Sequence, residues 1–157
     1  MIFREVAAGK AKLHRRNQSL ETVTCARRLD SPTETMSGVE EHLRVGIELF
    51  NRGEFFEAHE EMEEAMNSLE GDTSDWDFYL GLLRAAVANH KLSQGLLSSA
   101  RIHLRAALKF LAPYADRHRG LKLREFRSAL SAELARIEAL PAGSPAAISP
   151  PRIETAL

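Results

Sequence analysis

The sequence predicts an all-α protein, a five-helix bundle made of two related helical hairpins plus a closing C-terminal helix. Apolar residues recur at helical spacing in five successive segments, and no segment shows the strict alternation typical of a β-strand. A glycine-centred pattern recurs 42 residues along the chain, from Gly53 to Gly95. These observations place the helical domain at residues 37–140. Residues 1–35 lack a sustained apolar period and are predicted to be a disordered or dispensable tail, and residues 141–157 are predicted to be a disordered tail.

The first predicted helix begins near Ser37. Ser37 followed by Glu40 is a capping-box pattern, and an apolar series runs on from it. The series consists of Val39, Leu43, Ile47 and Phe50. Met36 stands immediately before this helix start, which leads to the hypothesis that Met36, rather than Met1, is the true first residue.

Four further helices are separated by turn or breaker residues. They are expected at about residues 54–69, 75–93, 97–112 and 123–140. The string EGDTSD ends the second helix, Gly95 marks a short turn, and Pro113 and Pro141 end the fourth and fifth helices. The remaining tail is rich in proline, alanine and serine, a composition typical of disorder.

The second and fourth helices belong to an internal repeat, because GEFFEAHEEMEEAM aligns with GLLSSARIHLRAAL. After Gly53 and Gly95, the matched apolar pairs are Phe55/Leu97, Ala58/Ala100, Met62/Leu104, Ala65/Ala107, Met66/Leu108 and Leu69/Leu111. Glycine suits a tight turn, and the small alanines let a partner helix approach. The spacing is similar to tetratricopeptide helices, although two copies are too few for a solenoid. We therefore expect two superposable hairpins with tetratricopeptide-like pairing.

Charge and cysteine content limit the classes of function. Residues 36–75 hold two basic and twelve acidic residues, whereas residues 76–140 hold eleven basic and five acidic residues. The basic residues are scattered with little aromatic interleaving, which favours acidic and basic parts of one fold, facing each other or forming opposite poles, over a nucleic-acid surface. The single Cys25 excludes an internal disulfide and a cysteine-based zinc site. With no apolar run of about 18 residues and no secretory signal, we expect a cytoplasmic protein with no membrane partner.

His59 and Glu63 are the central candidates for chemistry. At about 100° per residue, they fall between the methionine ridge and Phe56, and should be partly buried if Phe55 and Phe56 both are. Glu60 lies near the boundary of this face. The glutamates expected to be solvated are Glu57, Glu61 and Glu64.

His90 lies on the apolar stripe of the third helix and needs a polar partner there. If the hairpins pack together, His59, Glu63 and His90 should converge. Two histidines and a carboxylate can bind a divalent metal. They can equally form a buried hydrogen-bonded cluster that fixes helix register. No cofactor is required by the sequence, and both readings stay open.

Three arginines are candidate partners for these acids. Arg101 and Arg105 occupy the repeat positions of His59 and Glu63, which suggests that the hairpins recognise each other electrostatically. Arg84, on the third helix, is a further candidate partner for a buried carboxylate. Each of the three can equally be a solvated surface arginine.

The strings FNRGEFFEAHEEMEEAM and FYLGLLRAAVANHKLSQG resemble the family called domain of unknown function 309. The matching positions are Phe50, Asn51, Gly53, Phe55, Phe56, Glu57, His59, Glu60, Glu63, Gly81, Leu82, Leu83, His90 and Gly95. The resemblance covers about residues 38–115. It departs at Met66, Arg84 and Leu96, where the family usually has tryptophan, glutamine and asparagine. It implies a small all-helical bundle and no established activity.

Two classes of function remain, and no catalytic residue is identified for either. The first is a protein-binding or self-associating helical module, with a protein partner or a homodimer. The second is a metal- or small-ligand-binding protein, including a hydrolase-like enzyme, that uses His59, Glu63 and His90. Glu57 and Glu60 would be helpers in this second class.

Overall fold

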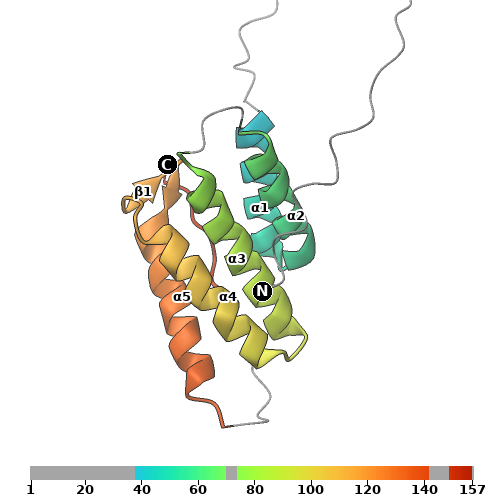
Figure 1. The fold of residues 1–157 in the computed structure, drawn as a ribbon, viewed down its shortest axis with the longest axis vertical. Coiled ribbons are helices and arrows are strands. Elements are labelled where there is room, and N and C mark those ends of the chain that lie inside the picture. The colour runs from blue at the N-terminus through green and yellow to red at the C-terminus, as the bar shows by residue number, and fades with distance from the viewer. Residues whose placement is uncertain (1–37, 70–73, 142–148, 157) are drawn as a thin grey trace, which may run out of the picture. The chain divides into compact units, whose positions relative to one another are not determined.

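The computed structural model describes residues 38–69, 74–141 and 149–156, which all belong to one compact unit, Glu34–Leu157. The elements are α1 (Gly38–Arg52), α2 (Phe55–Asn67), α3 (Trp76–Ser93), α4 (Leu97–Leu111), β1 (Arg117–His118), β2 (Leu121–Lys122) and α5 (Leu123–Glu138). Each helix packs against the next one along the chain (Figure 1). The all-α class and the five-helix bundle are therefore confirmed. In the part of the chain that is described, no helix is long and apolar enough to cross a membrane.

The two helical hairpins turn in the same way. Gly53 has φ of 84° and Gly95 has φ of 73°, in the left-handed region that glycine tolerates best. Gly53 N–H donates to Phe50 O at 3.0 Å, and the next N–H donates to Leu49 O at 3.0 Å. At Gly95 the equivalent bonds to Leu92 O and Lys91 O are both 2.9 Å. Both turns are Schellman motifs, which satisfy the last carbonyls of α1 and α3.

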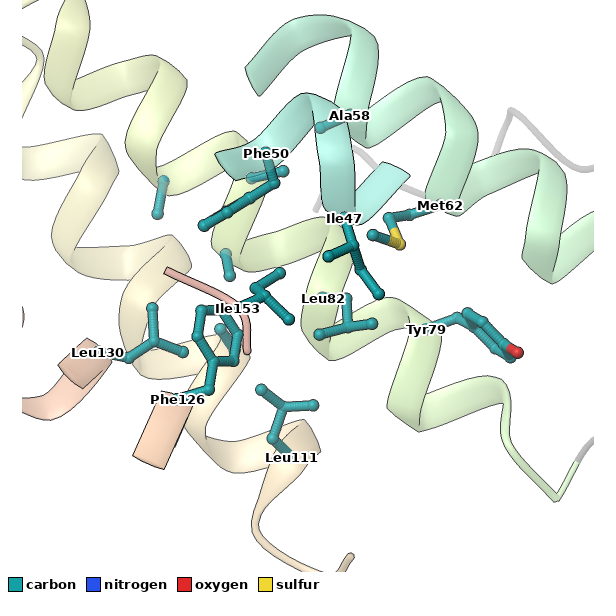
Figure 2. Close-up of a cluster of buried hydrophobic side chains, with 14 of the residues drawn as sticks. Ile47, Phe50, Ala58, Met62, Tyr79, Leu82, Leu111, Phe126, Leu130 and Ile153 are labelled. Carbon is teal, nitrogen blue, oxygen red and sulfur yellow. The ribbon is translucent and has the colours of Figure 1, made fainter. Parts of the chain in front are cut away.

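The core follows the repeat. Met62 and Leu104, which are equivalent, are 1% and 0% exposed, and the four matched alanines have no exposed surface. Those alanines are Ala58, Ala65, Ala100 and Ala107. Figure 2 shows Ala58 and Met62 of α2 beside Ile47 and Phe50 of α1. Burial of small residues at matched positions explains how each pair of helices approaches closely. Superposition of the whole hairpins stays a prediction.

A small β-hairpin joins α4 to α5, so the expectation that no strand occurs is wrong at residues 117–122. Arg117 pairs with Lys122 and His118 pairs with Leu121. Arg119 and Gly120 form the turn, with φ of 46° and 72°. A two-residue turn with both φ values positive matches the twist of a hairpin. Strands of only two residues are too short to leave an alternating sequence pattern.

A buried carboxylate holds this hairpin against the start of α3. Asp75, 7% exposed, accepts a hydrogen bond from His118 Nε2 at 2.8 Å and another from Arg119 Nε at 2.6 Å. A paired carboxylate in this position offsets the cost of its own burial and of the left-handed Arg119 backbone. This contact holds β1, through His118, and the turn, through Arg119, against the start of α3.

The predicted disorder of residues 141–157 is wrong for residues 149–156, which pack on the bundle as an extended segment. Ile153 is 3% exposed, and Pro151 is also buried. In Figure 2 the Ile153 side chain lies near Phe126 of α5 and Leu82 of α3. A single isoleucine entering the core outweighs the composition bias toward disorder. The expectations about residues 1–35, Met36 and the Ser37 cap concern residues outside the described ones.

Candidate functional site

The structure places His59 of α2 and His90 of α3 against the same aromatic ring, that of Phe56. The Phe56 ring centroid lies 5.0 Å from that of His59 and 5.7 Å from that of His90. His59 Nδ1 donates to the carbonyl of Phe56 at 2.5 Å, and Gln94 Nε2 donates to His90 Nε2 at 2.9 Å. A small depression of about 160 Å³ opens here. It is lined by Phe55, Phe56, His59, Val87, His90 and Lys91.

Glu63 is exposed, so the burial expected of it is wrong, and Glu60, expected near the boundary of the same face, is exposed as well. That expectation assumed that Phe55 and Phe56 are both covered. Phe55 is 6% exposed, but Phe56 is 48% exposed. Because the helix face next to Phe56 is open, a carboxylate one turn beyond His59 stays in water and needs no buried partner.

Arg84 contacts an imidazole. Its Nη1 lies 3.3 Å from Nδ1 of His103 on α4. Burial lowers the pKa of His103, and the charges of Arg84 and Lys91 lower it further. A neutral imidazole can accept the guanidinium hydrogen bond, which accounts for this arrangement.

The same polar contact occurs in the other hairpin. His42 Nδ1 of α1 donates to Glu61 Oε2 of α2 at 2.8 Å. His42 and Glu61 are the repeat equivalents of Arg84 and His103, and each pair is 19 residues apart. Glu61, which was expected to be solvated, is thus half-buried and paired. The sequence signal was the repeat itself, extended back into α1 and α3.

Arg101 and Arg105 contact α5, not the first hairpin. Arg101 Nη2 donates to Ile137 O at 2.8 Å, and Arg105 Nη2 donates to Glu138 Oε1 at 2.5 Å. The expectation of electrostatic recognition between hairpins is therefore wrong for these two arginines, because α5 occupies the face on which they stand.

Among the residues that the structure describes, no group of three or more His, Cys, Asp or Glu side chains is placed to hold a metal ion. His59, Glu63 and His90 are included in that search, so they do not form a three-ligand site in this geometry. The depression around Phe56 can instead present an aromatic ring and two imidazoles at the surface.

A second candidate site is the groove that holds residues 149–156, called here the segment groove. Asn51, at the end of α1, forms one side. Its Nδ2 donates to Ile153 O at 2.9 Å, and its Oδ1 accepts from Ile153 N–H at 2.8 Å. A single side-chain amide therefore satisfies both backbone groups of Ile153, as a neighbouring β-strand would.

The β-hairpin forms the other side of the segment groove. Lys122 N–H donates to Glu154 O at 2.9 Å, and Ala156 N–H donates to Gly120 O at 2.7 Å. These bonds make an antiparallel bridge between Leu121 and Thr155. The segment thus extends the small sheet by β-augmentation.

A cleft of about 630 Å³ remains open beside the bound segment. It is lined by Glu40, Leu43, Arg44, Ile47, Glu48, Asn51, Arg119, Gly120, Leu121, Ile153, Thr155 and Ala156. Its apolar residues come from α1, β2 and the segment itself, and its charged residues come from α1 and the hairpin turn. No sequence pattern predicted this site. The available signal was Asn51, a polar residue next to buried Phe50 in the F-N-x-G string.

Comparison with known proteins agrees with the resemblance seen in the sequence. Residues 43–103 match the family model described as "Domain of unknown function (DUF309)". The resemblance to that family is therefore confirmed over these residues, which reach from α1 into α4.

A protein of Aquifex aeolicus (strain VF5), described as "Uncharacterized protein", is 35% identical over 81 residues. The alignment covers 52% of this chain and 24% of the relative. The chain therefore spans about a quarter of the length of that relative. Neither description names an activity.

Proposed function

We propose that this helical unit is a protein-binding module whose segment groove takes up an extended stretch of polypeptide. The observation that carries the proposal is the pair of hydrogen bonds between Asn51 and the backbone of Ile153. Hydrogen bonds directed at a ligand's backbone give affinity for extended chains in general, whereas side-chain pockets give selectivity.

Two further observations support this proposal. The open cleft of about 630 Å³ beside the segment has the size and the apolar lining of a ligand-binding site. The similar part of the Aquifex protein is a quarter of a longer chain. A helical unit joined to further sequence in this way fits a binding module.

The proposal is tested by offering the segment as a separate peptide. The peptide carries the sequence of residues 149–156, SPPRIETA, with a fluorescent label. The receptor is the full chain with Ile153→Asp, because a charge on that side chain disfavours its entry into the apolar core. We expect saturable binding by fluorescence anisotropy.

The matched control adds Asn51→Ala to Ile153→Asp. Because Asn51 supplies both hydrogen bonds to the ligand's central residue, this double variant should bind at least tenfold more weakly. A folded Ile153→Asp chain that shows no binding up to millimolar peptide would contradict the proposed function.

A further inference from the structure

Buried and exposed side chains alternate along the bound segment, as in a β-strand with one covered face. Pro151 and Ile153 are buried, whereas Arg152 and Glu154 are exposed. Alternate side chains of an extended chain point in opposite directions, so the groove takes positions 151 and 153 and leaves their neighbours toward solvent. Ile153 is only 3% exposed.

The pocket for Ile153 is apolar and belongs to the main core. Figure 2 shows the side chain among Ile47, Leu82, Phe126 and Leu130. These four come from α1, α3 and α5, so the pocket is shaped by three helices at once. A pocket of this kind favours an aliphatic side chain and rejects a charged or a very small one.

Glu154, the residue after Ile153, forms an ion pair with Lys122. Lys122 Nζ lies 2.9 Å from Glu154 Oε2, and the same Lys122 holds the Glu154 carbonyl through its backbone N–H. The ion pair is exposed, with 36% and 61% of the two side chains accessible, so it adds modest selectivity. The groove therefore favours a peptide with an aliphatic residue followed by an acidic residue.

We propose that the segment groove selects extended peptides of the pattern Pro-x-aliphatic-acid, and that residues 149–156 compete with such a peptide of another protein for the same place. This inference rests on the proposed function of the groove. The chain's own segment has an effective concentration on the order of millimolar. A partner peptide must displace the segment, so it binds only when its concentration or its affinity is high enough to outcompete the segment.

A panel of labelled peptides tests the pattern on the full-length Ile153→Asp chain. The panel contains SPPRIETA, the same peptide with Val or Ala in place of Ile, and the same peptide with Lys in place of Glu. We expect Val to bind within about threefold of Ile, because it keeps a branched aliphatic side chain. Ala should bind at least tenfold more weakly, because it leaves the pocket unfilled.

The Lys peptide should bind a few-fold more weakly at low salt, and Lys122→Glu in the receptor should restore it. This charge exchange reports on the pair itself and not on folding. The Ile153→Ala chain, which adds no charge to the core, is measured in parallel and should give the same ranking of peptides. The unaltered chain should bind SPPRIETA at least tenfold more weakly than either variant, because its own segment occupies the groove.

The outcomes separate the two proposals. If no peptide binds any folded chain, the proposed function fails. If all peptides bind with equal affinity, the proposed peptide-binding function is supported but the proposed sequence pattern is wrong. If the unaltered chain binds as tightly as the Ile153→Asp chain, the competition between the segment and a partner is wrong.

Discussion

The hairpin α1–α2 and the hairpin α3–α4 share a backbone plan but differ in the polar residues at equivalent positions. Their glycine turns carry the same two hydrogen bonds, and their alanines are buried at matched places. The polar pair is His42–Glu61 in the first hairpin and Arg84–His103 in the second. The repeat therefore conserves packing geometry, while each hairpin uses its own chemistry for the same helix-to-helix contact.

The equivalents Asn51 and Ser93 differ most in what they contact. Asn51 holds Ile153, which lies 102 residues away in the sequence. Ser93 Oγ donates to His90 O at 2.7 Å, within its own helix. The residue that binds the C-terminal segment is therefore at a position where the two hairpins differ. Asn51 contacts a distant segment, whereas its equivalent Ser93 contacts only its own helix.

The first prediction concerns the buried pair Ile47 and Asn89, which are also repeat equivalents. Asn89 Nδ2 donates to Ala85 O at 2.9 Å, but Oδ1 has no partner among the described residues. Asn89→Leu should be neutral or stabilise the fold by up to about 1 kcal/mol, because an unsatisfied buried acceptor disappears. Ile47→Asn should destabilise it by about 3 kcal/mol. Urea denaturation measures both, and a larger loss for Asn89→Leu than for Ile47→Asn would contradict the comparison.

The second prediction concerns Asn51 and Ser93. Asn51→Ala should cost about 1–3 kcal/mol, because both backbone groups of Ile153 lose their partner. Ser93→Ala should cost less than about 0.5 kcal/mol, as expected for an exposed side chain. Trypsin cleavage after the exposed Arg152 gives an independent readout. Cleavage should become several-fold faster in Asn51→Ala and stay unchanged in Ser93→Ala; equal rates would show that Asn51 does not hold the segment.

The third prediction concerns the turns. Nothing lies within 4 Å of a Cβ built on Gly53 or Gly95, so only backbone strain opposes a side chain there. Gly53→Ala and Gly95→Ala should each destabilise the fold by about 1 kcal/mol, since both residues have positive φ. Thermal melts of the two variants should agree closely. A large cost at one glycine alone would mean that the two turns are not equivalent.

The fourth and smallest effect is a pH dependence from the second hairpin. The pKa of His103 is lowered in the folded protein, chiefly by burial. Between that lowered pKa and the ordinary value near 6.5, the unfolded chain binds more protons, so stability falls as pH falls. His103→Gln should therefore lose less stability than the unaltered chain between pH 7.5 and pH 5.5. Urea denaturation at the two pH values measures this, and identical losses would exclude the effect.

The sequence by itself determined the helices, the two glycine turns at Gly53 and Gly95, and the matched positions of the repeat. Helical periodicity and glycine placement act over a few residues, so Gly53, Gly95 and the matched alanines carried their structural meaning without tertiary information. The resemblance over residues 43–103 was likewise a property of local strings.

The tertiary structure alone decided how far the covered face of α2 extends around the helix. Phe55 and Phe56 are adjacent and chemically identical, yet Phe55 packs in the core against Phe50 of α1, whereas Phe56 lies half-exposed at the surface beside His90 of α3. Glu63 is exposed because it lies on the same open side of α2 as Phe56. Ile153 enters the core because Asn51 and Lys122, which are distant in sequence, present hydrogen-bonding groups along the same groove. Contacts between distant residues depend on the packing of whole helices, which no local pattern records.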